Sequence, residues 1–406
     1  MTNIEILEFK IENFTSINSE ITVNFADKDG LMRPITAFFG ANASGKSNIA
    51  KAYDVFLNTI INSCNANYRL IYLPFRLQVR TITSPTSFSI KFIHSKNTYE
   101  YGYSYTSEKI IREFLRIKNK NTNNYSYIFE RQKDTLNPSA KNFGFNQGIF
   151  KKTRPNSLLI TKAFEDNNSY ATIVQEAVRT ICVFTCDINR SEHIAINLMK
   201  DNPDIIEQLN SVLKKADFSL RKFEINNIHI PEEVLLSFMA PEPLKNTIRQ
   251  NGALSLNTKH YLRNGRDVVE QNGAKMYVTM NISDESMGTR DFIGLMTPIL
   301  YGAKIGGTAF IDEFGAYLHP VLAKAIISTC KNLYKKNGLR LIINTHNTYL
   351  MNYLDVDDCI LVEKDRIEES TTVIPLKKRV KNISFTEKNY NNNRLGAVGM
   401  IDEVLI

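Results

Sequence analysis

Hydrophobic and polar positions near the N-terminus alternate in the pattern of β-strands. Apolar residues recur over 4–11 and again over 20–25, and Asp27–Gly30 is a turn signal, so the sequence predicts a hairpin. The apolar run Ile35–Phe39 predicts a buried strand, and helical spacing follows it over 48–56. Alternation then returns in four segments, which predicts a β-meander over residues 86–93, 99–105, 108–117 and 125–130.

Four tyrosines of this meander share one face of a predicted strand, at positions 99, 101, 103 and 105. Such a row could serve as a platform on which bases stack. Packing across strands is the commoner reason for aromatic rows, and we expect it here.

The rest of the chain predicts an interrupted α/β architecture. Residues 131–157 are polar and predict a loop, and 158–184 predict a helix and then a strand. Residues 187–257 predict a mostly helical insertion, or arm, with a short helix within 231–245 and no heptad run for an extended coiled coil. From 258 onward, strands and helices alternate, with strands at 275–280, 308–311, 340–344 and 358–362 and helices from 283 and over about 320–336. The domain boundaries predicted from this pattern are 1–186, 187–257 and 258–406.

The segment GANASGKS, Gly40–Ser47, fits the phosphate-binding pattern G-x-x-x-x-G-K-[ST] between the predicted strand and helix. Glycine allows the backbone to bend closely around a phosphate, and loop N–H groups at a helix start attract anions. Lys46 can reach the β- and γ-phosphates, and the Ser47 hydroxyl can ligate Mg²⁺. We therefore expect a nucleotide to be held by Gly40, Asn42, Ser44, Gly45, Lys46, Ser47 and Asn48.

Composition narrows the class of protein. The chain of 406 residues has 43% hydrophobic and 23% charged residues, and it contains no apolar run long enough for a membrane span. The five cysteines form no zinc or redox motif and the N-terminus is unlike a signal peptide, so we expect a cytoplasmic protein. The net charge of +8 permits contact with nucleic acid, although a solvated surface is the simpler explanation of the late basic cluster Lys377–Lys381.

Two acids follow the buried strand 308–311. Beside a phosphate-binding loop, Asp312 can hold Mg²⁺ and Glu313 can polarise the attacking water. His346 follows the next predicted strand, where it can contact the γ-phosphate. A further anion-binding turn, with Ser286, Gly288 and Thr289, opens the helix near 283. Because this turn is far along the chain from the loop, we expect it to meet the nucleotide of a second subunit.

The motifs GANASGKSN, ESMGTRD, FIDEFGAYLHP and NTHN, in this order, resemble those of ABC-type ATPase heads of the SMC, RecF and OLD group. The resemblance implies an α/β head with a mixed sheet, a strand-rich lobe and a short helical arm, which binds ATP and Mg²⁺ between two heads. It identifies Lys46 and Ser47 as the Walker A pair, Asp312 and Glu313 as the Walker B pair and His346 as the switch histidine. It also assigns Ser286, Gly288 and Thr289 to the signature acting in trans, and Gln78 to the Q-loop.

Within that group the chain is similar to the RloA, AbiLi and AriA kind of ATPases from bacterial abortive-infection systems. The segments PTSFSIKF, YEYGYSY, ADFSLRKFEI and RLGAVG carry this likeness. It implies an ATPase that senses phage infection, assembles as a homodimer or higher homo-oligomer and controls a separate TOPRIM-like nuclease. DNA or a phage protein is then the candidate trigger. Only 60 residues follow His346, too few for a fused TOPRIM domain, so we expect no nuclease centre in this chain.

Two other hypotheses remain open. A RecF-like DNA-repair ATPase would clamp duplex DNA directly, which the basic composition permits. A pure assembly module would bind ATP and hardly hydrolyse it, although the acid at Glu313 argues against this.

Overall fold

The structure, a computed structural model, describes residues 4–119, 122, 124–184, 188–216, 220–228, 253–264, 266–380, 387–392 and 394–397. It divides into two compact units. The first comprises Met1–Thr185, Gly302–Phe314 and Lys324–Ile406, and the second comprises Cys186–Tyr301 and Gly315–Ala323.

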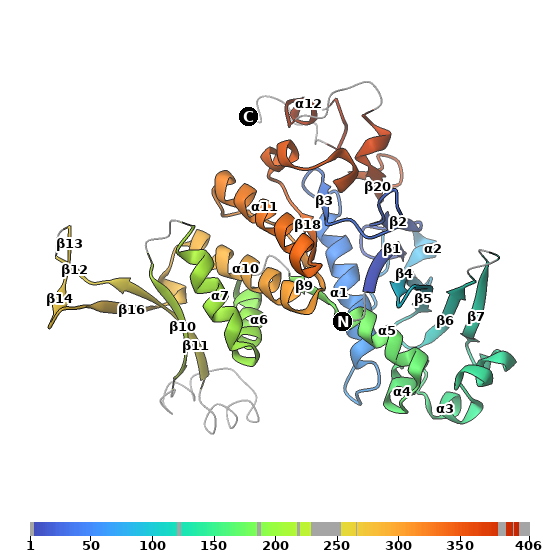
Figure 1. The fold of residues 1–406 in the computed structure, drawn as a ribbon. Coiled ribbons are helices and arrows are strands. Elements are labelled where there is room, and N and C mark those ends of the chain that lie inside the picture. The colour runs from blue at the N-terminus through green and yellow to red at the C-terminus, as the bar shows by residue number, and fades with distance from the viewer. Residues whose placement is uncertain are drawn as a thin grey trace. The chain divides into compact units, whose positions relative to one another are not determined.

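A six-stranded sheet forms the centre of the first unit (Figure 1). Its strands lie in the order β20-β19-β3-β18-β17-β9, and only β20 is antiparallel to its neighbour. Strands β3, β17 and β18 are buried along their whole length, which explains why they appear in the sequence as unbroken apolar runs. The bounds are β3 (Ile35–Phe39), β9 (Ile181–Phe184), β17 (Thr308–Ile311), β18 (Arg340–Asn344), β19 (Cys359–Lys364) and β20 (Thr371–Pro375).

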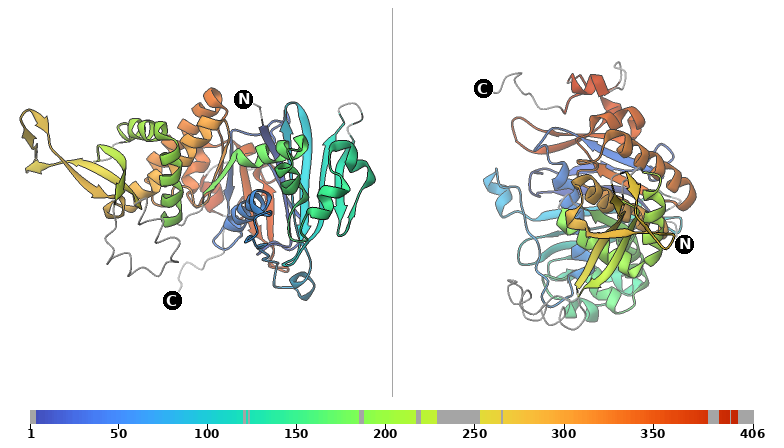
Figure 2. Two further views of the ribbon diagram at one scale, coloured as in Figure 1. Left: turned by 90° about the horizontal axis from the view of Figure 1, so that it is seen from below. Right: turned by 90° about the vertical axis from the view of Figure 1, so that its left-hand side faces the viewer.

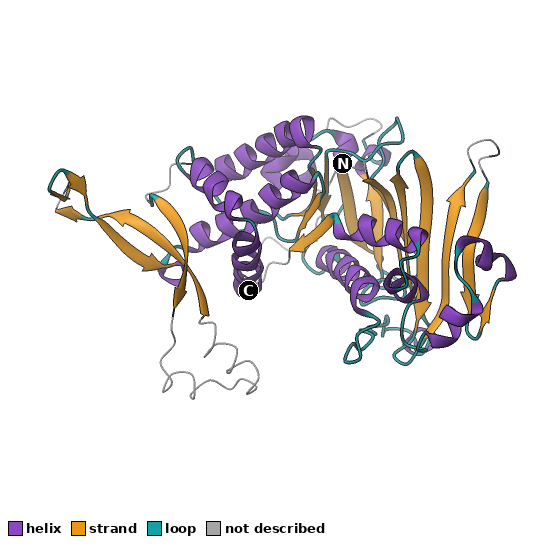
Figure 3. Ribbon diagram, turned by 60° about the horizontal axis from the view of Figure 1, so that its bottom comes forward, coloured by secondary structure: helices purple, strands orange, loops and turns teal. Residues whose placement is uncertain are grey.

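The second sheet of this unit is an antiparallel sheet of seven strands in the order β2-β1-β4-β5-β6-β7-β8 (Figures 1 and 3). The hairpin and meander predicted from the alternation are confirmed. The bounds are β1 (Ile4–Glu12), β2 (Ile21–Asn24), β4 (Thr86–His94), β5 (Asn97–Tyr105), β6 (Ile110–Lys118), β7 (Tyr125–Gln132) and β8 (Thr135–Leu136).

Helix α1 (Lys46–Asn62) packs against both sheets. The ring of Tyr53 lies 4.3 Å from that of Phe9 on β1 and 5.6 Å from that of Phe310 on β17. The ring of Tyr103 stacks on Phe56 at 5.6 Å. All four tyrosines of β5 are buried, so their cross-strand packing role is confirmed and a base-stacking role is excluded.

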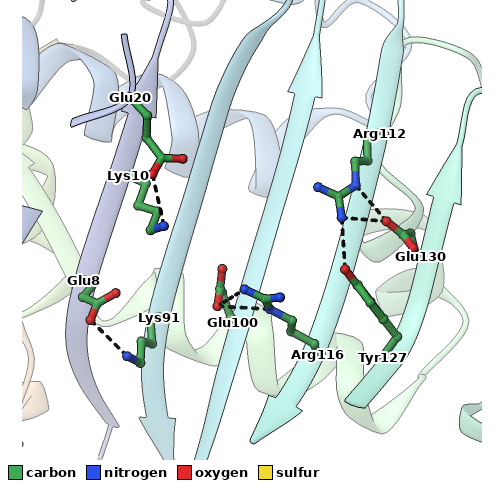
Figure 4. A network of polar contacts seen from close by, with 9 residues as sticks. All are labelled: Glu8, Lys10, Glu20, Lys91, Glu100, Arg112, Arg116, Tyr127 and Glu130. Carbon is green, nitrogen blue, oxygen red and sulfur yellow. Dashed lines mark hydrogen bonds and ion pairs between the residues drawn. The ribbon is translucent and has the colours of Figure 1, made fainter. Parts of the chain in front are cut away.

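The opposite face of the seven-stranded sheet carries charged side chains that pair across strands (Figure 4). Lys91 bonds Glu8, Arg116 bonds Glu100, and other pairs join Lys10 to Glu20 and Arg112 to Glu130. This division of the sheet into a buried aromatic face and a charged face explains the period of two in its sequence.

The segment 131–157, predicted to be loop, contains β8 and two short helices. They form because Asn146 caps α3 by accepting a hydrogen bond from the amide of Ile149, and because Phe145 packs 4.4 Å from Phe129. The remaining helices of this part are α2 (Val79–Ile82), the 3-10 helix η1 (Pro138–Phe143), α3 (Gln147–Lys152), α4 (Leu159–Glu165) and α5 (Ser169–Arg179).

The second unit combines helices with a three-stranded antiparallel sheet in the order β10-β11-β16. The segment 187–257 was expected to be mostly helical, yet strand β10 and the start of β11 lie within it. The strand pairing buries Phe223 beside Leu256, a contact between distant segments that helical periodicity does not reveal. The short helix predicted within 231–245 falls outside the described residues. The bounds are α6 (Ile188–Asp201), α7 (Pro203–Leu213), β10 (Lys222–Ile228), β11 (Ala253–Tyr261), β16 (Tyr277–Asn281), η2 (Ile282–Asp284) and α10 (Met287–Ile305).

We call residues 221–228 and 253–281 the β-arm. Beyond β11 and β16 it continues past α6 and α7 into two small hairpins (Figures 1 and 2). These are formed by β12 (Arg263–Asn264) with β13 (Asp267–Val268), and by β14 (Glu270–Gln271) with β15 (Ala274–Lys275).

The last part of the chain carries the late basic cluster. Two members of the late basic cluster are paired, since Lys377 lies 3.0 Å from Asp357 and Arg379 lies 2.9 Å from Glu363. Lys381 falls outside the described residues. The helical elements of this part are α11 (Pro320–Asn337), η3 (Thr348–Tyr353), η4 (Val356–Asp358), η5 (Leu376–Lys378) and α12 (Glu387–Asn391).

Among the described residues, no helix combines the length and the apolar character that crossing a membrane requires.

Candidate functional site

The loop between β3 and α1 has the backbone shape that its glycines predict. Gly45 has φ +108°, in the left-handed region that favours glycine. A Cβ at Gly45 would overlap Thr371 Oγ1, and a Cβ at Gly40 would overlap the carbonyl of Val362 on β19. Both glycines therefore allow the loop to lie close to strands β19 and β20. Asn42 is exposed at the loop.

Lys46 occupies the first turn of α1, and its side chain folds back into the loop. Its Nζ donates to the carbonyls of Gly40 at 2.7 Å and Ala41 at 2.9 Å, and only 5% of the residue is exposed. Burial lowers the pKa of Lys46 to about 8, although the negative charges of Asp312 and Glu313 act in the opposite direction. The loop thus contains a cation enclosed by carbonyl oxygens and near two carboxyl groups.

The ends of three parallel strands bring Ser47, Asp312 and Asn344 together. Ser47 Oγ donates to Asp312 Oδ1 at 3.1 Å, and Asn344 Nδ2 donates to the same oxygen at 2.7 Å. Asn344 Nδ2 also lies 2.8 Å from the carbonyl of Lys46. Burial raises the pKa of Asp312, while the hydrogen bonds from Asn344 and Ser47 lower it. The predicted proximity of Ser47 and Asp312 is therefore found, and Asn344 links the two segments.

Sequence reasoning did not include Asn344 in the site. The sequence contained a signal for this residue, because an amide side chain ends the apolar strand RLIIN, which lies beside the strand that leads to Asp312. Buried polar side chains in such places are normally hydrogen-bonded, and this one bridges both halves of the site.

Glu313 follows Asp312 at a sharp turn. Its φ of 54° is unusual for a residue with a side chain and is a common feature of functional sites. The turn is held by the amide of Phe314, which donates to the carbonyl of Asn344 at 2.8 Å, and by Thr345 Oγ1, which donates to the carbonyl of Phe314 at 3.0 Å.

His346 lies at the end of β18, within electrostatic reach of the loop. Partial burial lowers its pKa and the charge of Lys46 lowers it further, whereas Glu313 and Asp312 raise it. The net shift favours the neutral imidazole. His346 is thus close enough to feel the charges of Lys46, Asp312 and Glu313, and its role at a phosphate stays a prediction.

Two residues that sequence reasoning missed hold the loop from its other side. Thr371 Oγ1 donates to the carbonyl of Ser44 at 2.8 Å and lies 2.7 Å from Ser16 Oγ. Asn48 Nδ2 donates to Ser16 Oγ at 2.7 Å. Ser16 and Thr371 are 355 positions apart, and no local pattern signals that they meet.

Ser286, Gly288 and Thr289 belong to the second unit. Ser286 Oγ accepts the amide of Thr289 at 3.2 Å at the start of α10, as expected for a helix N-cap. The residue before it, Glu285, lies 2.6 Å from His260 Nε2 and accepts a hydrogen bond from Thr258 Oγ1 at 2.5 Å. Their role at a partner's nucleotide remains a prediction.

Gln78 precedes α2, where its Oε1 accepts a hydrogen bond from Arg80 Nε at 2.9 Å. Among the described residues, the side chains that bond to the 40–48 loop are those of Ser16, Asp312, Asn344 and Thr371. The structure shows no contact that brings Gln78 to this loop, and its assignment stays a prediction.

Comparison with known proteins identifies a family that this chain matches. Residues 35–352 match the family described as "AAA domain, putative AbiEii toxin, Type IV TA system". A search of curated proteins found none that matches the sequence.

Solved structures similar to this chain include heads of SMC proteins. One is an SMC head bound to the C-terminal winged-helix domain of ScpA, at 15% identity, covering 91% of this chain and 97% of that one with a TM-score of 0.49. The SMC head from Thermotoga maritima matches at 14% identity, 91% and 98% coverage and a TM-score of 0.42. The Pyrococcus furiosus SMC head with an extended coiled coil, bound to the C-terminal domain of ScpA, matches at 14% identity, 93% and 98% coverage and a TM-score of 0.46.

The family match spans well over half of the chain and includes the loop, the acidic pair and His346. A P-loop domain of this class implies nucleotide binding. The chain therefore belongs to the AAA family described as putative AbiEii toxins of type IV toxin–antitoxin systems, a family of P-loop ATPase domains.

Proposed function

We propose that this protein binds and hydrolyses ATP in the presence of Mg²⁺ and uses the nucleotide to control a partner in bacterial anti-phage defence. The observation that carries the proposal is the chain of contacts from Lys46 through Asn344 to Asp312 and Ser47. It unites the phosphate-binding loop with the acid that follows β17.

The side chains fit a magnesium ion. Ser47 Oγ and Asp312 Oδ1 lie 3.1 Å apart at the end of the sheet, and both are oxygen donors of the kind Mg²⁺ prefers. The ion, held by few protein ligands together with water and phosphate oxygens, would supply positive charge that neutralises the phosphates.

Each remaining residue has a role that its position supports. Lys46 would exchange its carbonyl partners for phosphate oxygens, and loop amides would orient the phosphates. Glu313 would accept a proton from the attacking water or orient that water, and neutral His346 would contact the terminal phosphate.

The regulatory part of the proposal rests on the family and on the resemblance of the motifs. The family description refers to a putative toxin of a toxin–antitoxin system, which supports a role in defence. We infer homodimers or larger homo-oligomers in which Ser286, Gly288 and Thr289 meet the nucleotide of the partner head. The controlled partner would be a separate TOPRIM-like nuclease, with DNA or a phage protein as the trigger.

The test measures the mass of the purified protein, with and without ATP and Mg²⁺, for the wild type and for Glu313→Gln and Lys46→Ala. We expect ATP to produce dimers or larger multiples, Glu313→Gln to slow hydrolysis and retain these assemblies, and Lys46→Ala to abolish nucleotide binding. A protein that stays monomeric in every condition contradicts the sandwich model. Unchanged ATP binding by Lys46→Ala removes that residue from the phosphate site.

A further inference from the structure

The β-arm has a solvent-facing surface with an unusual set of side chains. Strand β16 is exposed along its length, and Tyr277 is 47% exposed. The Tyr277 ring stacks on that of Tyr261, with centroids 5.1 Å apart. Arg221 lies 4.5 Å and Lys275 lies 5.3 Å from the centroid of the Tyr261 ring. Two aromatic rings and two cations thus share one patch.

Strand register determines which side chains join this patch. Phe223, Leu256 and Thr258 are buried on one face of the sheet. Residues that alternate with them point to the other face, where Lys222 pairs with Lys259 across β10 and β11 and Tyr261 pairs with Tyr277 across β11 and β16. We call this the basic–aromatic face; it comprises Lys222, Lys259, Tyr261 and Tyr277 by register, together with Arg221 and Lys275, whose charged groups lie over the Tyr261 ring.

The β-arm carries an excess of positive charge. Its Lys and Arg residues are Arg221, Lys222, Lys259, Arg263, Arg266 and Lys275, against the acids Glu224, Asp267 and Glu270. Lys222 and Lys259 share the single carboxylate of Glu224, each at 2.8 Å. Among the described residues, Arg221, Arg263, Arg266 and Lys275 form no ion pair with a carboxylate.

The late basic cluster offers a contrast within the same protein. There, Lys377 and Arg379 each have a carboxylate partner, as is usual for a solvated surface. In the β-arm, Arg221 and Lys275 have no such partner among the described residues, and they lie beside the half-buried ring of Tyr261 and the exposed ring of Tyr277. This combination needs a different explanation.

We propose that the basic–aromatic face binds single-stranded nucleic acid. Arginine and lysine neutralise backbone phosphates, and an exposed tyrosine ring provides a surface on which a base stacks whatever its identity. Lys222, Lys259, Lys275 and Arg221 would follow the phosphates, and Tyr277 would stack with a base. Every residue of β16 is exposed, so solvent reaches this face of the sheet along the whole strand.

This site goes beyond the proposed ATPase function and does not depend on it, because none of its residues belongs to the nucleotide site. Nucleic-acid binding is measured without ATP, and ATP binding is measured separately. Lys46→Ala should bind the oligonucleotide like the wild type, and the arm variants should bind a fluorescent ATP analogue like the wild type. Failure of one proposal is thus distinguishable from failure of the other.

The experiment titrates the full chain into labelled oligothymidylate, oligouridylate and a DNA duplex, and follows fluorescence anisotropy at several salt concentrations. The charge variant is Arg221→Glu with Lys275→Glu, and its control, Lys377→Glu with Lys378→Glu, makes the same change in net charge on the late cluster. The stacking variant is Tyr277→Leu, with Tyr277→Phe as the conservative control. Circular dichroism and thermal unfolding verify that every variant is folded.

We expect the wild type to bind the single strands more tightly than the duplex. The arm charge variant should lose tenfold or more in affinity, and its salt slope should fall by about 1.4, or about 0.7 for each lost phosphate contact. Tyr277→Leu should lose about fivefold or more, the lower end of the range for a stacked base, and Tyr277→Phe should match the wild type. The ratio of affinities for the DNA and RNA strands then identifies the preferred strand.

Several results would overturn the proposal. They are no saturable binding at low salt, an equal loss in the control charge variant, undiminished binding by Tyr277→Leu, or tighter binding to the duplex. Competition by polyglutamate as effective as that by unlabelled oligonucleotide would also overturn it, and would indicate an acidic protein as the partner.

Discussion

His260 Nε2 lies 2.6 Å from Oε1 of Glu285, the residue that directly precedes Ser286. The contact joins strand β11 of the β-arm to the start of α10, and Thr258 Oγ1 donates to the same carboxylate oxygen. Glu285 is only 10% exposed in its side chain, so the pair is held in a sheltered position. A change in the β-arm can therefore reach Ser286 through this hydrogen bond.

This relationship leads to a first prediction about turnover. His260→Ala removes one of the two side-chain partners of Glu285 and leaves Thr258. We expect ATP hydrolysis to fall by about tenfold, within the range typical of coupling between sites. ATP affinity of the isolated subunit should not change, because His260 lies in the other unit from Lys46. His260→Gln keeps a donor toward Glu285 and should retain most of the activity. Equal rates for the alanine variant and the wild type would show that this contact does not position the signature turn.

A second prediction concerns Asn344. Asn344→Ala leaves Asp312 with Ser47 as its remaining side-chain donor and removes the donor to the carbonyl of Lys46. We expect a loss of about 1–3 kcal/mol in the free energy of unfolding, because buried polar atoms lose their partner. The pKa of Asp312 should rise further, so the Mg²⁺ concentration needed for nucleotide binding should increase at slightly acidic pH. Urea unfolding and Mg²⁺ titrations test both effects, and wild-type values in both would contradict the bridging role.

A third prediction uses two glycines with positive φ. Gly45 has no space for a Cβ, whereas Gly273 at φ +76° has no atom within 4 Å of that position. Gly273→Ala should cost about 1–2 kcal/mol from backbone conformation alone. Gly45→Ala should cost more than about 2 kcal/mol, since overlap with Thr371 and Ser16 adds to the same backbone term, and nucleotide binding should be lost. Chemical unfolding of both variants measures the difference, and equal costs would contradict the close packing at the loop.

A fourth prediction concerns pH. Burial raises the pKa of Asp358 to about 6, above its ordinary value of 3.8, and the nearby charge of Asp355 acts in the same direction. The folded state therefore binds this proton more tightly than the unfolded state does. The resulting stability is fully present below pH 3.8 and is lost as pH rises through 6.

Asp358→Asn removes the cost of burying a charged carboxylate at neutral pH. It also keeps an acceptor for the amide of Asp355. We expect the variant to exceed the wild type in free energy of unfolding by on the order of 1 kcal/mol near neutral pH, and the difference to vanish in acid. Asp357→Asn serves as the control, because it removes only the surface pair with Lys377, which should have little effect. An advantage of Asp358→Asn that persists in acid would contradict titration as its cause.

The phosphate-binding loop could be predicted because its chemistry is local. Gly40, Gly45, Lys46 and Ser47 lie within eight consecutive residues, and each is required by the shape or charge of the same turn. Strands β3, β17 and β18 could be predicted equally well, since burial on both faces demands continuous apolar runs. The parallel arrangement of their ends then places Asp312 beside Ser47.

The other side of the site could not be found in this way. Ser16 and Thr371 are ordinary small polar residues, and nothing in their neighbourhoods indicates that they hold the loop through Ser44 and Asn48. Strand β10 was missed for a similar reason, because Phe223 becomes a core residue only when it lies beside β11.

Features that depend on residues close together along the chain could thus be predicted: the loop, the buried strands, the acids at 312 and 313 and the α/β class. The contacts between distant polar groups emerge only from the folded chain, among them Asn344 with Asp312, Thr371 with Ser16 and His260 with Glu285. The physical reason is that a hydrogen bond depends on the separation of two atoms in space, whereas periodicity and motifs record only separation along the chain.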